Sequence, residues 1–515
     1  MQVNSKPFKT QNYLFIYTSY FMPIIKNLAA TVFIFLLISF TACGEPTDIQ
    51  PGSLTEDVEK RIYQVENSLS EWVLIEGTSK WNILDRMKHY NVKGLSIAVI
   101  KDHQIEWAKG YGYTDSLQTN PIITSTVFQA ASISKSLNSM ALVKLAQEGK
   151  IDLDADINNY LKRWKFPYDS LSNGQVITTK NLLNHSGGLS ISGFPGYATS
   201  DSIPSIIDIL NGTGPANTAA VPSIFEPNKR VSYSGGGTTI SQLMVEEVSG
   251  QKYEDYLHDQ VLEPLGMSGS TFRYGNTINP ELVPTGHDPA GNAVKGKYHN
   301  YPEKGAAGLW TTSSDLARFV IDTQLSLKNK SNKVLSKEMT ELRFVPFDEK
   351  SMSGLGMFID RFPGTDYFLH RGWNQGFIGW YIGDLKAGNG MAIMCNANDF
   401  AILNEVKNSI AAVYDWEDNQ PVTKAVHFPS TEVTTAYLGE YVDEDDGTKF
   451  VVTKDADSLK LAINGGEEST IYFTSDTDFF ILDLSFWCSF QKSETGEVKS
   501  ILLKRATERF ELIKS

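Results

Sequence analysis

The chain alternates between stretches with the apolar spacing of a helix and stretches with the alternation of a β-strand. Residues 54 to about 90 have a helical pattern, and their apolar stripe contains Val58, Ile62, Val65, Leu69 and Trp72. Apolar runs at 94–100 and 104–110 flank a polar triplet, which predicts a β-hairpin. Residues 133–145 return to helical spacing, and Gly149 follows as a stop signal.

The second half of the chain repeats this order of helices followed by strands. Helices are predicted at 239–250, at 253–262 and from residue 315, and strands at 355–359, 367–369, 376–383 and 390–396. A polar gap at 415–427 precedes a tail of short alternating strands, at 449–453, 458–463, 469–473, 478–482, 498–503 and 509–513. We therefore predict a mixed α/β (α+β) body at 54–415 and an all-β domain, most economically a small barrel, at 428–515.

Composition and charge narrow the function classes. A length of 515 residues predicts two domains plus tails, and 41% hydrophobic with 21% charged residues is typical of globular proteins. A formal net charge of −14 argues against nucleic-acid binding, which needs a basic face. Three cysteines cannot form a disulfide framework, and their spacing fits no zinc site. The histidines are scattered and form no metal-binding motif. We therefore predict no metal site and no cofactor.

The N-terminus has the pattern of an export signal. Residues 28–40 form an apolar run that is shorter than a membrane span, and Thr-Ala-Cys43 follows it. This arrangement resembles the cleavage box of bacterial lipoproteins, although Phe40 replaces the usual aliphatic residue. We predict a signal peptide at 1–42, whose true start is Met22 if the first residues are an over-extension, and a tether at 43–53.

Lipidation of Cys43 would anchor the exported protein in a bacterial cell envelope, facing the periplasm or the cell surface. The alternative is a secretory signal that is cut elsewhere, with Cys43 incidental.

Ser132 and Lys135 stand three residues apart where the helix at 133–145 begins. Positions i and i+3 share a helix face, so the lysine amine can take the proton of the serine hydroxyl or stabilise its alkoxide. Apolar flanks are expected to lower the pKa of Lys135, which is the direction a base needs. Alone, the pair is a weak signal, because a helix cap followed by a surface lysine has the same spacing.

Four further motifs follow in order. They are Leu182-Leu-Asn-His-Ser-Gly-Gly-Leu189, Tyr233-Ser-Gly235, Leu262-Glu-Pro-Leu-Gly-Met267 and His370-Arg-Gly372. Together with the block at 306–319, they resemble the serine β-lactamase-like family, which contains class C β-lactamases, D-alanyl-D-alanine carboxypeptidases, esterases and D-amino-acid peptidases. The resemblance covers about residues 84–400. It implies an antiparallel sheet flanked by helices plus a helical lobe, with the serine at their junction, and some relatives also carry a C-terminal β-barrel.

The resemblance assigns roles to individual residues. It implies that Ser132 is the nucleophile, that Lys135 is its partner, and that Tyr233 shuttles protons with a pKa lowered by the nearby lysine. His370 and Gly372 would line the pocket, and the backbone N–H of Trp373 would form an oxyanion hole with that of Ser132. The bulky Trp373 side chain is expected to narrow the acyl site.

Two positions depart from the family pattern. Gly235 stands where the family has asparagine, and the run Gly235-Gly236-Gly237 is expected to be mobile or tightly turned. His370 replaces a lysine that would hold a substrate carboxylate. Both departures argue against an efficient β-lactamase. His185, in the second motif, is interpreted as a structural loop brace.

The leading hypothesis is a secreted serine hydrolase that cleaves an ester or a peptide amide, including cell-wall-derived substrates, through an acyl-serine intermediate. The alternatives are a penicillin-binding-type D-Ala-D-Ala carboxypeptidase or a β-lactamase. A third is a non-catalytic envelope binding protein, against which the presence of Ser132, Lys135 and Tyr233 together counts. The sequence does not predict the oligomeric state.

Overall fold

The computed structural model describes residues 54–515, except 417–418, 445–446, 457 and 506–507. The predicted signal peptide, the tether and Cys43 lie outside the described residues. Within the described part of the chain, no helix is long and apolar enough to cross a membrane. The described residues divide into a larger unit, 54–71 with Ser79–Pro421, and a smaller unit, Trp72–Thr78 with Val422–Ser515.

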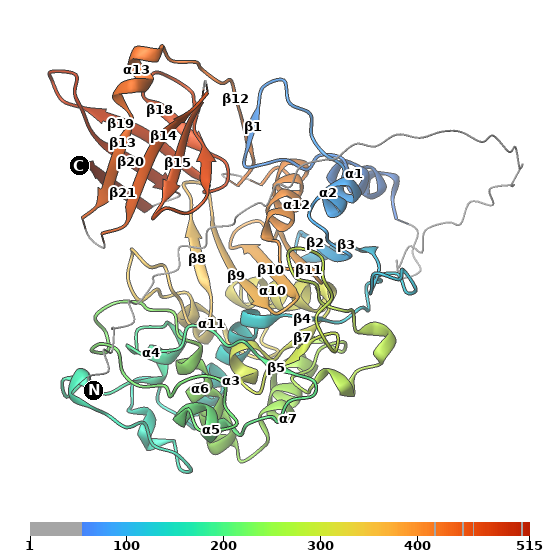
Figure 1. The fold of residues 1–515 in the computed structure, drawn as a ribbon. Helices are drawn as coiled ribbons and strands as arrows, with labels where there is room; N and C mark the ends of the chain where they lie inside the picture. The colour runs from blue at the N-terminus through green and yellow to red at the C-terminus, as the bar shows by residue number, and fades with distance from the viewer. Residues whose placement is uncertain (1–53, 417–418, 445–446, 457, 506–507) are drawn as a thin grey trace, which may run out of the picture. The chain divides into compact units, whose positions relative to one another are not determined.

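A six-stranded antiparallel sheet forms the centre of the larger unit (Figure 1). Its order is β3-β2-β11-β10-β9-β8, so strands from both ends of the unit's sequence lie side by side. The strands are β2 (Gly94–Lys101), β3 (Gln104–Gly112), β8 (Phe358–Arg361), β9 (Asp366–Asn374), β10 (Phe377–Asp384) and β11 (Gly390–Cys395). The β2–β3 pair confirms the predicted hairpin.

Helices cover both faces of this sheet because its central strands are apolar on both sides. One face packs against α1 (Glu56–Glu66), α2 (Ile83–His89) and α12 (Phe400–Val413), in a core that includes Ile97 and Ile393. Across the other face lies α10 (Ser313–Leu327), and this second core continues into the helical lobe. The fold is the mixed α/β arrangement that the sequence predicts.

The helical lobe surrounds α3 (Ser134–Gln147), most of whose side chains are buried. Its buried side chains are mostly apolar or small, with Lys135 and Asn138 as buried polar exceptions, as expected for an element enclosed by others. The remaining helices beyond the sheet are α4 (Thr179–Leu183), α5 (Ile206–Asn211), α6 (Gly235–Ser249), α7 (Tyr253–Leu257), α8 (Glu263–Leu265), α9 (Lys304–Ala307) and α11 (Lys337–Arg343). A π-helical segment, His258–Leu262, joins α7 to α8.

The smaller unit contains a nine-stranded, all-antiparallel sheet that curls into a nearly closed barrel, which confirms the predicted all-β tail. The order is β16-β15-β14-β13-β21-β20-β19-β18-β17. The strands are β13 (Gly439–Asp443), β14 (Lys449–Asp455), β15 (Ser458–Ile463), β16 (Glu468–Thr470), β17 (Tyr472–Phe473), β18 (Asp478–Ile481), β19 (Phe486–Lys492), β20 (Val498–Arg505) and β21 (Glu508–Lys514). Aromatic rings fill the barrel, and Tyr437, just after α13 (Thr431–Ala436), stacks on Phe490 at 3.8 Å.

The predicted helical stretch from residue 54 to 90 does contain α2, but its continuous apolar stripe is wrong beyond Glu66. The helix α1 ends there, and Trp72 belongs instead to the smaller unit, where its indole N–H donates to the Leu482 carbonyl at 3.0 Å. Its ring also packs on Trp487 at 4.9 Å. The next residues form β1 (Val73–Ile75), which pairs in parallel with β12 (Val422–Lys424).

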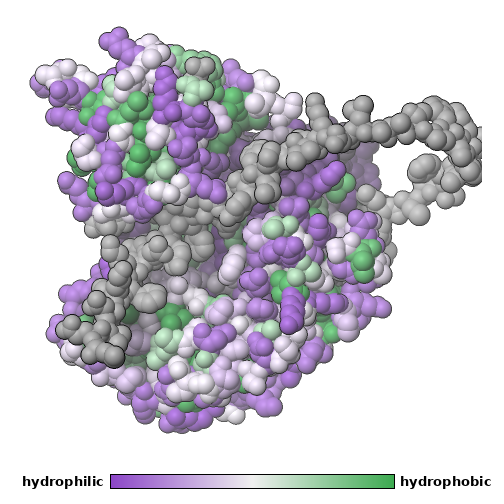
Figure 2. Space-filling view, in the orientation of Figure 1, coloured by the Kyte–Doolittle hydropathy of each residue, from purple (hydrophilic) through white to green (hydrophobic). Residues whose placement is uncertain are grey.

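Polar residues dominate the visible face of the larger unit, and apolar residues appear there only in small separate patches (Figure 2). Polar and charged residues are mostly exposed in globular proteins, so this face follows the usual division between core and surface.

Candidate active site

Ser132 lies at a sharp turn between a short strand and the buried helix α3. The strand β4 (Phe128–Gln129) pairs with β7 (Trp310–Thr311), and a 3-10 turn, Ala131–Ile133, leads into α3. Ala131 has a φ of 49°, a left-handed conformation that is uncommon for a residue with a side chain. Such a conformation persists where its surroundings enforce it, and it is frequent at functional sites.

Gly372 of β9 allows this turn to lie against the sheet. A Cβ atom at Gly372 would lie 2.1 Å from the Ala130 carbonyl oxygen and 3.2 Å from the Ala131 Cβ. Any other residue here would push β9 away from the turn. The glycine therefore brings the backbone of β9 next to Ser132, which is the geometry that the predicted oxyanion hole requires.

Lys135 is one helical turn after Ser132 and is only 3% exposed. Its Nζ lies 3.1 Å from Ser132 Oγ and 2.8 Å from the Ala306 carbonyl oxygen of α9. Burial lowers the pKa of Lys135 to about 7, because the charged ammonium is poorly solvated there. A large share of the amine is then unprotonated near neutral pH, with a lone pair available beside the serine.

Tyr233 completes the group around Ser132. Its phenol hydrogen-bonds Ser132, and Lys135 Nζ lies 4.9 Å from the centre of its ring. The expectation that Lys135 lowers the pKa of Tyr233 is wrong for this structure, because burial raises that pKa and outweighs the opposing hydrogen bond from Ser132. Tyr233 is therefore a neutral phenol at the start of any reaction.

Three rings surround Tyr233. His185 lies 4.4 Å away between ring centroids, while Phe358 and His370 each lie 6.2 Å away. The Nδ1 atom of His185 accepts from the Ser234 backbone N–H at 3.3 Å, which agrees with its interpretation as a loop brace. Phe358 was not among the predicted site residues, since one phenylalanine at the start of a strand carries no distinguishing signal.

His370 is buried and neutral. Its Nδ1 lies 2.6 Å from the Arg371 carbonyl oxygen, so Nδ1 carries the hydrogen and Nε2 keeps a lone pair. Nε2 is buried without a hydrogen-bond partner among the described residues. Burial, together with the charge of Lys135, lowers the pKa of His370 to about 3. The imidazole therefore does not replace the permanent cation of a family lysine.

Trp373 and Arg371 lie on the opposite face of β9 from His370 and Gly372, as strand alternation requires. The Arg371 guanidinium lies 4.1 Å from the ring centre of Trp380, and Trp373 is 46% exposed. The Trp373 side chain thus projects away from the face that carries His370. The strand geometry therefore argues against the expectation that the Trp373 side chain narrows the acyl site.

Gly235 is the first residue of α6, so the expectation of a mobile or tightly turned glycine run is wrong. Ser234 caps the helix by accepting from the Gly237 N–H at 2.8 Å. A Cβ atom at Gly235 would lie 2.9 Å from the Phe194 ring and 3.2 Å from the Ser192 carbonyl oxygen. The glycine lets the loop that carries Phe194 occupy the space where the family asparagine would begin.

A comparison with models of known protein families identifies the family to which the residues around Ser132 belong. The family model described as Beta-lactamase matches residues 82–415. The chain belongs to this family. The earlier resemblance to serine β-lactamase-like proteins is thereby confirmed, and the family supports serine hydrolase activity.

Two known proteins show sequence similarity to this chain at about one quarter identity. Penicillin-binding protein 4* of Bacillus subtilis (strain 168) is 25% identical over 435 residues, which cover 77% of this chain and 90% of that protein. Protein flp of Staphylococcus aureus (strain MRSA252) is 26% identical over 327 residues, and the match spans 60% of each protein.

Solved structures share the fold. The octameric penicillin-binding protein homologue from Pyrococcus abyssi has a TM-score of 0.55 at 22% identity, over 84% of this chain and 98% of that one. D-amino acid amidase from Ochrobactrum anthropi SV3, complexed with L-phenylalanine, has a TM-score of 0.54 at 20% identity, over 70% of this chain and 98% of that one.

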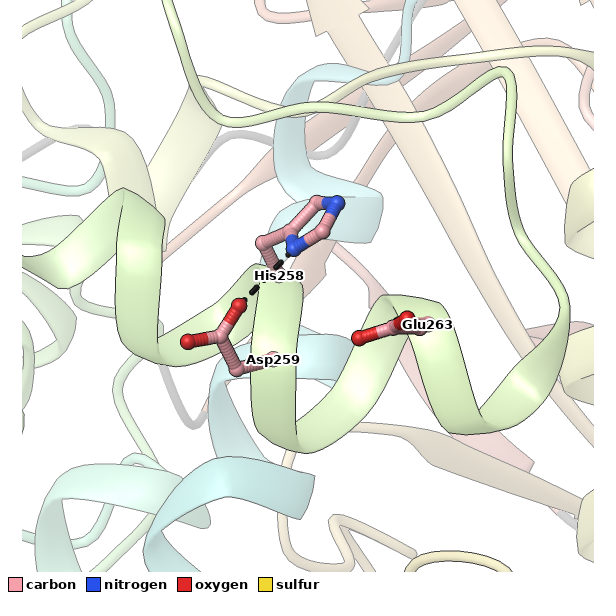
Figure 3. A group of neighbouring side chains, drawn as sticks. All are labelled: His258, Asp259 and Glu263. Atoms are coloured by element: carbon pink, nitrogen blue, oxygen red, sulfur yellow. Dashed lines mark hydrogen bonds and ion pairs between the residues drawn. The ribbon is translucent and has the colours of Figure 1, made fainter.

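One group of side chains has metal-ligand composition. His258, Asp259 and Glu263 place one ligand atom each within 4.8 Å of one another, and His258 Nδ1 lies 2.9 Å from an Asp259 oxygen (Figure 3). All three are exposed; His258 and Asp259 lie at the start of the π-helical segment, and Glu263 is the first residue of α8. Exposed acidic groups of this kind are common without a metal, and these belong to elements that carry none of the residues around Ser132.

Proposed function

We propose that this protein is a serine hydrolase that cleaves an ester or a peptide amide through an acyl enzyme on Ser132. The observation that carries the proposal is the environment of Lys135. A buried amine whose pKa falls to about 7, 3.1 Å from a serine hydroxyl, is suited to remove that hydroxyl's proton.

In the proposed first half-reaction, neutral Lys135 accepts the proton of Ser132 while Oγ attacks the substrate carbonyl carbon. The backbone N–H groups of Ser132 and Trp373 would stabilise the developing oxyanion. When the intermediate collapses, the neutral Tyr233 phenol gives its proton to the leaving oxygen or nitrogen, and the Lys135 ammonium returns a proton to Tyr233.

In the second half-reaction, water attacks the acyl-serine carbonyl and loses a proton to the neutral Lys135 amine, while Tyr233 remains the proton donor. The new tetrahedral intermediate expels Ser132 Oγ, which takes a proton back. Because Lys135 and Tyr233 both begin neutral, each can serve once as acceptor or donor in each half-reaction.

Two residues near Ser132, His370 and Gly235, bear on the class of substrate. His370 offers a neutral ring where a permanent cation would hold a carboxylate, and Gly235 lacks the family amide, so we favour esters or small peptides over β-lactams. The likeness to penicillin-binding protein 4* supports a second candidate, a D-Ala-D-Ala carboxypeptidase. A non-catalytic binding protein would not need the buried base beside Ser132.

A substrate panel tests the proposal. We would assay p-nitrophenyl esters, D- and L-amino-acid p-nitroanilides and a chromogenic cephalosporin with the wild type and with Ser132→Ala. Ser139→Ala is the matched control, because it removes another buried hydroxyl of α3 that bonds Leu355. Fluorophosphonate labelling in the wild type and the control, but not in Ser132→Ala, is expected. An unlabelled wild type with no turnover would refute a hydrolase.

Location is proposed from the N-terminal sequence. We expect the protein to be exported and anchored in a bacterial envelope through lipidated Cys43. In a bacterial host, wild type should partition with membranes, and Cys43→Ser should be released or left unprocessed. A soluble product cut at another residue would contradict the anchor.

A further inference from the structure

The most unusual buried group outside the proton path described above is Glu303. This residue directly precedes α9, and its carbonyl accepts from the N–H groups of Ala306 and Ala307, which fixes its backbone. Its side chain is completely buried. Neither carboxylate oxygen has a hydrogen-bond partner on another described residue.

An isolated carboxylate is costly to bury, and native proteins normally pair or coordinate it. The neighbouring cation does not serve this purpose, because Lys304 pairs with Glu254 at 2.7 Å. Burial raises the pKa of Glu303 to about 8, and only its own backbone N–H opposes this shift. The carboxyl group is thus mostly protonated at neutral pH, and a positive charge bound beside it would favour its ionised form.

The surroundings of Glu303 are rich in phenols. Burial raises the pKa of Tyr197, Tyr274 and Tyr301, and a negative charge on Glu303 adds to each shift, so all three side chains lie within electrostatic reach of the carboxyl group. Aromatic faces beside a carboxylate are the usual surroundings of a bound ammonium group, since both attract a cation.

Glu303 is linked to the candidate active site through a small apolar cluster of Phe194, Ile209, Tyr301, Ala306 and Ala307. Ala306, three residues after Glu303, accepts the hydrogen bond from Lys135. The Phe194 ring lies against Gly235, two residues after Tyr233. The Tyr301 hydroxyl accepts from the Gln375 N–H at 3.0 Å, two residues after Trp373. The cluster therefore contacts Lys135 itself and the residues that lie two positions after Tyr233 and Trp373.

Phe194 is the most exposed member of this cluster and lies in a stretch, 191–196, without helix or strand. Rotation of one side chain in an irregular loop requires little rearrangement of the core. A substrate group that reaches Glu303 from the side of Gly235 would therefore have to displace the Phe194 ring, which lies against that glycine.

We propose that Glu303 binds a cationic group of the substrate, a primary ammonium carried on the acyl moiety. This inference rests on the proposed hydrolase function and adds an amine-bearing acyl group as the substrate class. The ammonium would give the Glu303 carboxylate the positively charged hydrogen-bond donor that it lacks. The tyrosine rings would lie around the bound ammonium.

The test compares amine-bearing acyl p-nitroanilides with neutral ones of equal length. The series is glycyl, β-alanyl, 4-aminobutyryl and 6-aminohexanoyl, each paired with the acyl group in which methyl replaces the ammonium. The measured quantity is the ratio of kcat/KM for amine over neutral substrate. We expect a ratio of about tenfold or more at one chain length, equivalent to about 1.4 kcal/mol.

Glu303→Gln should bring this ratio to about one, whereas Glu254→Gln, which removes the carboxylate next to Lys304, should leave the ratio unchanged. Glu303→Asp withdraws the carboxylate by one methylene, so the preferred chain should become longer. This shift is a result that general damage to the fold would not produce. A ratio near one in the wild type, or a preference that survives Glu303→Gln, would overturn the proposal.

Different results would contradict the hydrolase function and the Glu303 site. If Ser132 does not react with fluorophosphonate and no substrate turns over, the hydrolase itself is refuted, and the Glu303 proposal falls with it. If Ser132 reacts but no anilide turns over, 6-aminohexanamide and heptanamide are compared as protectants of Ser132 against labelling. Stronger protection by the amine that depends on Glu303 supports the site, and equal protection overturns it.

Discussion

The protonation state of Lys135 leads to the sharpest prediction, in which Lys135→Arg is the perturbation. Arginine can retain the bond to the Ala306 carbonyl oxygen and the positive charge, but it stays protonated at any pH used in an assay. The variant therefore removes the base and keeps most of the other properties of the side chain. Lys144→Arg, on the same helix and paired with Glu148 at 3.4 Å, is the matched control.

The magnitude follows from the pKa of about 7. At pH 7.5 about three-quarters of such a lysine is neutral, whereas only about one in a thousand would be neutral at the ordinary pKa. We expect Lys135→Arg to lower kcat/KM by on the order of a thousandfold, which is about 4 kcal/mol in the barrier. Lys144→Arg should stay within about twofold of the wild type.

The assay is kcat/KM for the best p-nitrophenyl ester between pH 5.5 and 9.5, corrected for ionisation of the product. The active form of a base is the deprotonated one, so the rate should rise about tenfold per pH unit below the pKa and become level above about 7. A rise that continues towards pH 10, or an arginine variant within tenfold of wild type, would refute the assignment of Lys135 as the base.

Three further predictions test other parts of the structure. Tyr233→Phe keeps the ring packing on His185 but removes the hydroxyl, so we expect at least a hundredfold lower kcat with a melting temperature within a few degrees of wild type. Gly235→Asn should destabilise the fold by about 1–3 kcal/mol, because its Cβ would meet Phe194, while Gly193→Asn, with open space around its Cα, should not. Trp72→Ala should destabilise the smaller unit by about 3 kcal/mol in denaturant unfolding, since it removes the contacts with Trp487 and Leu482.

Local patterns in the sequence predicted the elements that depend on neighbours in the chain. The hairpin at 94–110 and the i, i+3 placement of Ser132 and Lys135 follow from spacing alone. Trp72 shows where such reasoning fails. Its position continues the spacing of the α1 stripe, but its partner Trp487 lies more than four hundred residues away in the sequence. No window of neighbouring residues contains that information.

The sequence predicted the direction of only some of the pKa shifts, because these shifts also depend on contacts between distant parts of the chain. The sequence gives the identity of the charged groups but not how completely they are buried. For Lys135 the apolar flanks indicated the correct direction of the pKa shift. For Tyr233 the nearby cation suggested a lower pKa, but burial has the larger effect. Glu303 gave no signal, because a glutamate before a short helix is ordinary until the structure shows its carboxylate buried without a partner.

Burial acts on Lys135, Tyr233 and His370 in the same sense, since each is more stable in its neutral form in this environment. The free site thus favours a neutral amine, a neutral phenol and a neutral imidazole. The first charges to form during attack on a carbonyl are then the oxyanion and the Lys135 ammonium, which stabilise each other. A permanent cation at position 370 would favour substrates that bring a carboxylate, and it would also lower the pKa of Tyr233. With histidine there, charge recognition is left to groups farther from Ser132, and the proposed role of Glu303 is to select for a positive charge rather than a negative one.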